Sequence, residues 1–296
     1  MEFFKLPSII SKLDSPFLQA HEIELSLKRD DLIHAAVSGN KWRKLKYNLL
    51  EAQKKGIKQL ITFGGAYSNH IAATAAAGNL LGIKTIGVIR GEEGFENETL
   101  LLAQKNGMKL HFVSRTDYRQ KNELDFRADL ISRFGDSLIV PEGGANALGV
   151  LGCQEILEEV NEVYDVVACS AGTGTTASGI CKRLKKEKLL VFPALNGGQF
   201  ILEEMKAHCT PKQIKQVELQ LDYHFGGYAK TKPELIEFYF QFLKDFNIEL
   251  DLVYTSKMMY GLYDLIQKQY FPRGTKILAI HTGGVQGNKG ILKSKN

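Results

Sequence analysis

Short apolar runs alternate along the chain with longer segments of helical periodicity, and glycine-containing turns separate the two. Residues 59–63 (QLITF), for example, lead through the turn GGAYSN into a helical segment at 69–81. Short apolar runs bounded by turn residues are typical of buried strands. The predicted strands are 59–63, 84–89, 109–113, 166–170, 189–192 and 276–280, and the predicted helices are 69–81, 96–106, 118–134, 177–184 and 199–207.

This alternation predicts an α/β fold, because strands that alternate with helices form parallel sheets covered on both faces. The number of strand–helix units would fit two such sheets, and residues 141–146 (PEGGAN) are a plausible crossing between them. Ligands of such folds bind beyond the carboxyl ends of the strands. The glycine-rich turns stand at those ends, so we expect the functional site there.

Composition narrows the class of protein. With 296 residues, of which 44% are hydrophobic and 24% charged, the chain is typical of a globular protein with a sizeable core. The net charge of +5 comes from scattered basic residues, and the run 182–186 is interpreted as a solvated helix end, not as a nucleic-acid surface. No stretch is apolar enough to cross a bilayer and no signal sequence begins the chain, so we expect a cytoplasmic protein.

The cysteines do not indicate a metal site. Cys153, Cys169, Cys181 and Cys209 stand far apart and form no CxxC pair. Free thiols in a reducing compartment are therefore expected, and no bound metal is predicted.

The first segment that carries chemistry is SGNKWRKL at residues 38–45. Gly39 breaks regular structure and a helix follows up to Gly56, which places Lys41 in the first turn. A cation is unfavourable at the positive end of a helix, and such local conflicts are a mild sign of function. From this segment alone, an exposed lysine at a basic helix start is the simpler interpretation.

The second segment is GGAYSNH at residues 64–70, between a predicted strand and a predicted helix. Ser68 is placed to cap the helix, which would leave the backbone amides of Asn69 and His70 free to bind an anion. The segment is thus either a clamp for a substrate carboxylate or an ordinary capped turn.

The third segment is AGTGTTASG at residues 171–179, which follows an apolar strand and opens a helix. Its glycines let several backbone N–H groups converge, and its threonine hydroxyls add donors, as a phosphate site requires. The segment lacks the GK[ST] of a nucleotide-binding P-loop and the spacing of GxGxxG. Phosphate binding without a nucleotide is the functional interpretation, and a plain glycine-rich turn is the alternative.

Two tyrosines complete the candidates. Tyr254 is expected at the end of a strand, with Thr255 and Ser256 opening the next helix, and Tyr228 follows two glycines in a loop. Taken alone, a tyrosine at either place is more often a packing residue than a catalytic one.

Taken together and in this order, the segments resemble the D-cysteine desulfhydrase and 1-aminocyclopropane-1-carboxylate (ACC) deaminase family. The motifs are LKRDDL, SGNKWRKLKYNL, GGAYSNH, LDLVYTSKMMYGL and HTGGV, within residues 27–287. That family belongs to the pyridoxal 5'-phosphate (PLP) enzymes of fold type II, which are similar to the tryptophan synthase β-subunit. The resemblance implies two open twisted parallel-sheet domains with helices on both faces, with the active site between them in a homodimer. The large PLP-binding domain would comprise 1–44 and 150–296, and the small inserted α/β domain 45–149.

The resemblance also implies roles for individual residues. Lys41 is expected to hold PLP as a Schiff base and then to act as the base on the substrate, with Tyr254 or Tyr228 assisting proton transfer. Ser68 would bind the substrate carboxylate together with the neighbouring residue His70, and Asn69 would reach the phenolic oxygen of the cofactor and the substrate. Tyr254 would stack on the cofactor ring beside Thr255, and the phosphate would be bound by Gly172, Thr173, Gly174, Thr175 and Thr176.

Two positions favour one branch of the family. ACC deaminases resemble one another in carrying glutamine and glutamate where this chain has His70 and Thr255. A carboxylate near the pyridine nitrogen keeps that nitrogen protonated and strengthens the electron sink, whereas threonine offers only a neutral hydrogen bond. Loss of a thiolate needs a weaker sink than opening of a cyclopropane ring. The sequence therefore predicts conversion of D-cysteine to pyruvate, sulfide and ammonia; the alternatives are ACC deamination to 2-oxobutyrate, another PLP reaction such as racemisation, and a binding module without catalysis.

Overall fold

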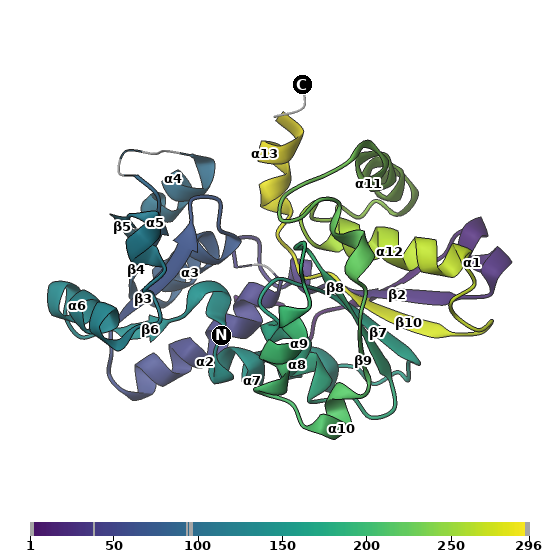
Figure 1. The fold of residues 1–296 in the computed structure, drawn as a ribbon, viewed down its shortest axis with the longest axis horizontal. Helices are drawn as coiled ribbons and strands as arrows, with labels where there is room; N and C mark the ends of the chain where they lie inside the picture. The colour runs from purple at the N-terminus through teal and green to yellow at the C-terminus, as the bar shows by residue number, and fades with distance from the viewer. Residues whose placement is uncertain (1–2, 38, 93, 95–96, 294–296) are drawn as a thin grey trace. The chain divides into compact units, whose positions relative to one another are not determined.

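The computed structural model describes residues 3–37, 39–92, 94 and 97–293. The chain divides into two compact units (Figure 1): unit 1 contains residues 1–34, 38–40 and 153–296, and unit 2 contains residues 35–37 and 41–152. The main crossings lie between Asn40 and Lys41 and between Gly152 and Cys153. The division into domains at 44/45 and 149/150 remains a prediction.

Unit 1 contains a six-stranded sheet in the order β1-β2-β10-β7-β8-β9. Its strands are β1 (Ile10–Leu13), β2 (Glu24–Lys28), β10 (Lys276–Ile280), β7 (Val166–Ala171), β8 (Lys188–Pro193) and β9 (Val217–Leu219). Neighbouring strands are parallel except β1, which runs antiparallel to β2. The predicted parallel sheet therefore has one antiparallel strand at its edge, because the link between β1 and β2 is too short for a parallel crossover.

Alternate residues of the central strands pack on opposite faces of this sheet, as the period of two requires. Val166 and Ala168 face α11 (Pro233–Phe246) and α12 (Thr255–Gln267), together with α1 (Pro16–His21). Val167 and Cys169 face α8 (Thr175–Cys181) and α9 (Phe200–Lys206), together with α7 (Ala147–Glu158). Figure 1 shows α11 and α12 on one side of the strands and α8 and α9 on the other.

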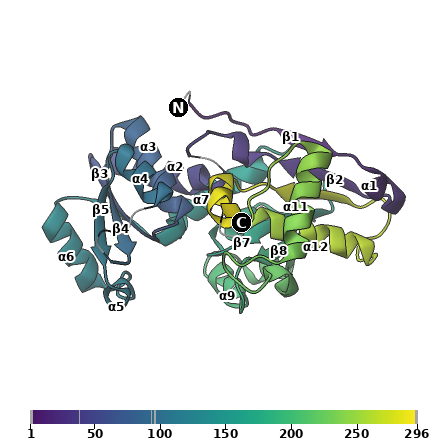
Figure 2. The same ribbon diagram turned by 90° about the horizontal axis from the view of Figure 1, so that it is seen from above.

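Unit 2 contains a four-stranded parallel sheet in the order β5-β4-β3-β6. Its strands are β5 (Lys109–Val113), β4 (Lys84–Arg90), β3 (Gln59–Gly65) and β6 (Leu138–Val140). Ile86 and Val88 pack against α6 (Leu124–Phe134), whereas Ile89 packs against α3 (Asn69–Leu81) and α4 (Glu98–Lys105). Figure 2 shows α6 and α3 on opposite sides of these strands. The two sheets, each covered by helices on both faces, confirm the predicted α/β class.

The remaining elements connect these layers. They are α2 (Asn40–Lys54), α5 (Arg115–Tyr118), α10 (Pro211–Ile214), α13 (Asn288–Lys293) and four single turns of 3₁₀ helix, Asp30–Leu32, Glu142–Gly144, Leu221–His224 and Val285–Gly287. The segment predicted as the crossing, 141–146, lies within unit 2, and the chain changes units farther on, inside α7. In the described part of the chain, no helix combines the length and the apolar character needed to span a bilayer.

Several predicted elements differ from the structure. The helix predicted at 118–134 is two helices, α5 and α6, because the polar turn between them has no apolar residue to bury and is closed by Arg127 Nε, which donates to the Lys121 carbonyl oxygen at 2.9 Å. The helix predicted from Glu96 begins at Glu98 with Asn97 as its cap, and Glu96 itself lies outside the described residues, as does Ser38. The residues before Tyr254 form a turn and not a strand.

Candidate functional site

The carboxyl end of β7 leads into the glycine–threonine loop, residues 172–176. Gly174 has a positive φ of 72° and caps α8, so Thr175 and Thr176 form the first helical turn. Both threonines are buried, at 3% exposure, and Thr173 Oγ1 lies 3.0 Å from Thr175 Oγ1. The first N–H groups of a helix have no acceptor within it and point outward. The loop therefore combines backbone donors with hydroxyl groups at one point, which is the arrangement that binds a phosphate.

Asn40 connects the loop 172–176 to Lys41, the residue that follows Asn40 in the chain. Its Nδ2 donates to Thr176 Oγ1 at 3.0 Å, and its backbone N–H donates to the Thr282 carbonyl oxygen at 3.2 Å. Gly39, just before it, has a positive φ of 63° and lies directly against the same Thr282 carbonyl. Lys41 is half-buried in the first turn of α2, as predicted. The backbone at Lys41 is thus held to the glycine–threonine loop through its neighbour.

Tyr254 lies over the same loop. A methyl group at Gly172 would stand 3.1 Å from Tyr254 Oη and 3.3 Å from its Cε1, so the ring covers the place that a side chain would occupy. The Tyr228 ring packs edge-on against it, with 6.1 Å between ring centroids and 70° between planes. The structure therefore brings together the two predicted tyrosines and the predicted phosphate loop.

Asp251 sets the position of Tyr254. Its Oδ1 accepts the Tyr254 backbone N–H at 2.6 Å, and its own N–H donates to Thr255 Oγ1 at 2.7 Å. Leu252 N–H donates to Asn288 Oδ1 at 2.9 Å. Because side chains bind these backbone groups, the segment turns instead of forming a strand. Thr255 is fully buried and its hydroxyl is hydrogen-bonded to the Asp251 backbone.

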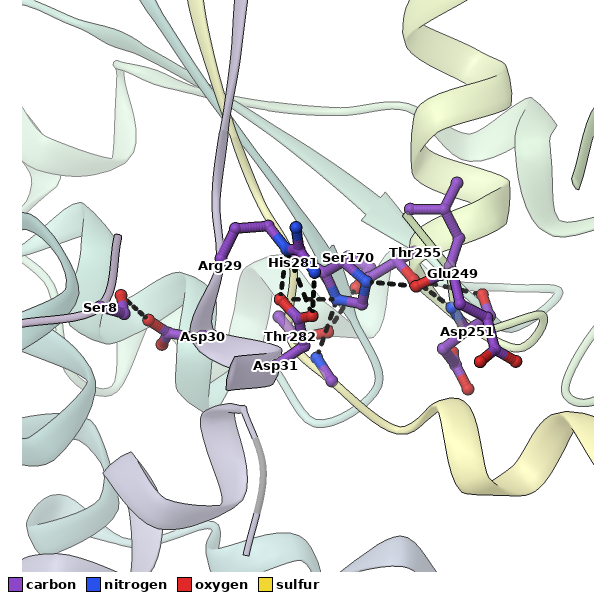
Figure 3. A network of polar contacts seen from close by, with 12 residues as sticks. Ser8, Arg29, Asp30, Asp31, Ser170, Glu249, Asp251, Thr255, His281 and Thr282 are labelled. Carbon is purple, nitrogen blue, oxygen red and sulfur yellow. Dashed lines mark hydrogen bonds and ion pairs between the residues drawn. The ribbon is translucent and has the colours of Figure 1, made fainter. Parts of the chain in front are cut away.

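A polar network around His281 holds the backbone just after β10 (Figure 3). His281 Nε2 donates to the Glu249 carbonyl oxygen at 2.8 Å, while its Nδ1 accepts the Gly283 N–H at 3.2 Å. The ring is therefore neutral; burial lowers the pKa of His281, and the Asp31 carboxylate opposes that shift. Asp31 in turn pairs with Arg29 at 2.7 Å. The network fixes the backbone at 282–283, against which Gly39 and Asn40 lie.

Unit 2 places the second group of predicted residues at the start of α3. Ser68 Oγ accepts the Ile71 N–H at 3.4 Å, which confirms Ser68 as the helix cap. The backbone N–H groups of Asn69 and His70 lie in the first turn, where no acceptor within the helix exists. The Ser68 hydroxyl still has its own proton to donate. These three groups can bind an anion such as a carboxylate.

The His70 side chain points into unit 2. It is 2% exposed, and its Nε2 lies 2.8 Å from Thr62 Oγ1. Thr62 donates its own proton to the Val140 carbonyl oxygen, so His70 Nε2 must be the donor to Thr62. Burial lowers the pKa of His70 well below its usual value, and the charges of Lys41 and Lys44 lower it further. The neutral ring leaves Nδ1 as an acceptor, for which the described residues supply no donor. Substrate binding by His70 stays a prediction.

Comparison with known proteins decides the family. A family model described as "Pyridoxal-phosphate dependent enzyme" matches residues 11–283. The chain belongs to this family. A Thermotoga maritima protein named "Putative 1-aminocyclopropane-1-carboxylate deaminase" is 31% identical to it, over 91% of each chain. An Arabidopsis thaliana protein named "Bifunctional D-cysteine desulfhydrase/1-aminocyclopropane-1-carboxylate deaminase, mitochondrial" is 29% identical, over 95% of this chain and 77% of that protein.

The solved structures agree with this assignment. The crystal structure of an ACC deaminase homologue superposes with a TM-score of 0.83 at 28% identity, and covers 99% of this chain and 95% of that one. A PLP-dependent aspartate racemase, at 15% identity and a TM-score of 0.66, shares the fold. These matches confirm the predicted family, the fold type of this PLP enzyme and PLP as its cofactor.

The residues of unit 1 fit the phosphate end of PLP. The loop 172–176 presents the N-terminus of α8, where helix geometry leaves backbone donors available, and buried threonine hydroxyls stand beside it. Gly172 leaves room for the Tyr254 ring over that loop. The individual roles given to Lys41, Ser68 and Asn69 stay predictions.

The sequence missed several residues that organise the site. Asn40 stands inside the SGNK motif, but nothing local indicates that its partner is Thr176, 136 positions away. The turn at Asp251 has a readable signal, since an aspartate shortly before a helix commonly accepts hydrogen bonds from backbone N–H groups of a turn. The contact between His281 and the Glu249 carbonyl oxygen has no local signal, because the two residues are 32 positions apart.

Proposed function

We propose that this PLP enzyme acts on D-cysteine and releases pyruvate, sulfide and ammonia. The observation that carries the proposal is Thr255, a neutral and fully buried residue next to Tyr254, where the ring-opening branch of the family has glutamate. Its hydroxyl is engaged with the Asp251 backbone, so it brings no charge to that side of Tyr254. When bound, PLP supplies an electron sink for negative charge at the substrate α-carbon.

The chain's own residues would divide the remaining work. Lys41 would attach the cofactor covalently and, once displaced by the substrate amine, its Nζ would accept the α-proton. Asn40 favours this role, because it fixes the backbone of Lys41 beside the phosphate loop through Thr176. Ser68 and the first amides of α3 would orient the substrate carboxylate. Tyr254 would cover the cofactor, and Tyr228 packs against it at the more exposed side.

ACC is the second candidate substrate. The names of the relatives favour it, since the Thermotoga maritima protein is named a putative ACC deaminase and the Arabidopsis thaliana protein carries both activities in its name. Thr255 argues against ACC, because a neutral residue cannot keep the pyridine nitrogen protonated as a carboxylate does.

One assay separates the two substrates. The purified protein, loaded with PLP, is given D-cysteine or ACC, and the keto acid formed is identified as pyruvate or 2-oxobutyrate. We expect pyruvate from D-cysteine, with a kcat/KM for ACC at least about tenfold lower. Lys41→Ala should abolish turnover and the visible absorbance of the bound cofactor. A wild-type protein that prefers ACC would refute the D-cysteine assignment.

Position 255 can be tested directly. Thr255→Glu should raise turnover of ACC relative to D-cysteine, because it adds a carboxylate beside Tyr254. Thr255→Gln is the matched control, since it adds the same bulk at this buried position without the charge. If both variants change the substrate ratio equally, charge at residue 255 does not determine the branch.

A further inference from the structure

Lys257 is a fully buried lysine that the reaction described above does not use. It is the third residue of α12, in the segment that carries Tyr254, and its side chain is 1% exposed. Its Nζ donates to the carbonyl oxygens of His224 and Gly227, each at 2.8 Å, and to that of Ala194 at 3.4 Å. The three protons of the ammonium thus have three backbone carbonyl oxygens as acceptors. Carbonyl oxygens can surround a monovalent metal cation in the same way.

The carbonyls belong to two segments that border the candidate site. His224 and Gly227 lie in the loop 224–229, which carries Tyr228. Ala194 follows β8, and its N–H donates to the Ala171 carbonyl oxygen, directly before the glycine–threonine loop. A methyl group at Gly227 would be 3.7 Å from the backbone N of Asn196, so the two segments also pack against each other.

The backbone of the loop 224–229 needs a contact that holds it in place. The hydrogen bonds from Lys257 to its carbonyls are called the tether below. Phe225 and Ala229 have φ near +53°, and Gly226 and Gly227 have φ of +92° and +118°. Left-handed conformations at residues other than glycine are unfavourable and persist only where surrounding contacts hold them. The Lys257 ammonium is such a contact, because it gathers two carbonyls of this loop around a single charge.

We propose that Lys257 is a positioning residue whose ammonium serves as an internal monovalent cation, holding the loop 224–229 so that Tyr228 packs on Tyr254. The consequence for catalysis rests on the proposed function, but the tether itself does not. Burial lowers the pKa of Lys257 to about 8, and the Asp251 carboxylate opposes that shift. The side chain is thus mostly charged at pH 7, as the tether requires.

The test replaces the ammonium and keeps the apolar stem. Lys257→Met leaves the three carbonyls without their cation and leaves space for a small one. Hydrogen–deuterium exchange of the loop 224–229 is measured on the protein without PLP, in sodium, potassium or ammonium chloride at equal ionic strength. We expect faster exchange of this loop in Lys257→Met, with protection restored by potassium or ammonium ions, whereas the wild type responds to none of the salts.

Turnover gives a second readout. With PLP and substrate, Lys257→Met should lose up to about 100-fold in kcat, the order of loss that a misplacement of about 1 Å produces. The same ions should restore part of it. Lys182→Met is the matched control, because Lys182 Nζ also binds one backbone carbonyl, that of His208 at 3.0 Å, but in an exposed position. It should change neither loop exchange nor turnover.

The outcomes separate this inference from the proposed function. If the wild type turns over neither substrate, the proposed function fails, yet the exchange experiment still tests the tether. If Lys257→Met keeps wild-type loop protection, or loosens without any response to potassium or ammonium, the inference is wrong. Should Lys257→Met not fold in any of these salts, Lys257→Leu takes its place, since it also removes the ammonium and leaves space for a small cation. The same response to cations is then expected, and its absence overturns the inference.

Discussion

Gly39 is the position at which one added methyl group tests the placement of Lys41. A Cβ there would stand 1.9 Å from the Thr282 carbonyl oxygen and 2.7 Å from Gly283 N, all backbone atoms that cannot rotate away. A contact of that kind below 3.0 Å essentially does not occur, so one of the two backbones must move by about 1 Å. The variant Gly39→Ala should therefore displace Asn40 and the start of α2.

Two effects lower the free energy of unfolding of Gly39→Ala. An alanine at a φ of 63° costs about 1–2 kcal/mol. The movement also weakens two backbone hydrogen bonds, from Gly39 N–H to the Asp30 carbonyl oxygen (2.9 Å) and from Asn40 N–H to the Thr282 carbonyl oxygen (3.2 Å). Each is worth about 0.5–1.5 kcal/mol, so the free energy of unfolding should fall by roughly 2–5 kcal/mol in total. A shift of about 1 Å at Lys41 should lower kcat by about 100-fold.

Gly56→Ala is the control. Gly56 also has a positive φ, 70°, but a methyl group there would meet nothing within 4 Å. Gly56→Ala should lower the free energy of unfolding only by the cost of a left-handed backbone at alanine, about 1–2 kcal/mol, and leave kcat unchanged. Urea unfolding and substrate turnover of the two variants, measured side by side, isolate the effect of the close approach. Equal losses for both variants would refute the conclusion that Thr282 positions the residues before Lys41.

Two further predictions follow from the site. Because the folded protein keeps His70 neutral well below the usual pKa of 6.5, the unfolded chain binds a proton there that the folded chain does not, and stability should fall as the pH falls below about 6.5. His70→Gln can keep the donor to Thr62 but cannot titrate. Between pH 6.5 and 5, the free energy of unfolding, measured with urea, should therefore depend less steeply on pH in the variant, by up to about 1.4 kcal/mol per pH unit. An unchanged pH dependence would contradict a neutral His70 in the folded protein. Gly172→Ala would place a methyl group 3.1 Å from Tyr254 Oη. It should weaken PLP binding by about tenfold, while the free energy of unfolding of the PLP-free protein falls by less than about 1 kcal/mol. Gly290→Ala is the control, because a methyl group there meets nothing within 4 Å, and it should change neither quantity.

Local signals predicted the elements that local interactions determine. The helix α3 begins and ends at the predicted residues, because Ser68 caps its first turn and Gly82 adopts the left-handed conformation just after its end. The glycine–threonine loop was located for the same reason, since Gly174 supplies the positive φ from which α8 starts. Of the candidate site, the two turns proposed to bind anions could thus be located from the residues themselves.

Long-range contacts determine what the sequence could not predict. The turn before Tyr254 depends on Asn288, 36 residues beyond Leu252, so the apolar pattern there suggested a strand. Lys257 reads as an ordinary helical lysine, and only the folded chain brings the carbonyls of Ala194 and Gly227 to it. Pairing Lys41 with a cofactor required the resemblance to a family, because its local context favours an exposed residue.

The charges at the helix starts show why that local context misleads. Acidic residues are favoured in the first turn of a helix, where they balance the positive end of the helix dipole. The helices α4, α6 and α11 follow this rule with Glu98, Asp125 and Glu234. Among the helices whose first turns carry predicted site residues, α2, α3 and α8 have no acidic residue there, and α2 adds Lys41 instead. Each of these helix ends therefore keeps its positive potential for an external anion, and the PLP phosphate and a substrate carboxylate are anions of the kind that such ends bind. The unfavourable position of Lys41 is thus part of a pattern shared by three segments, which a single segment cannot reveal.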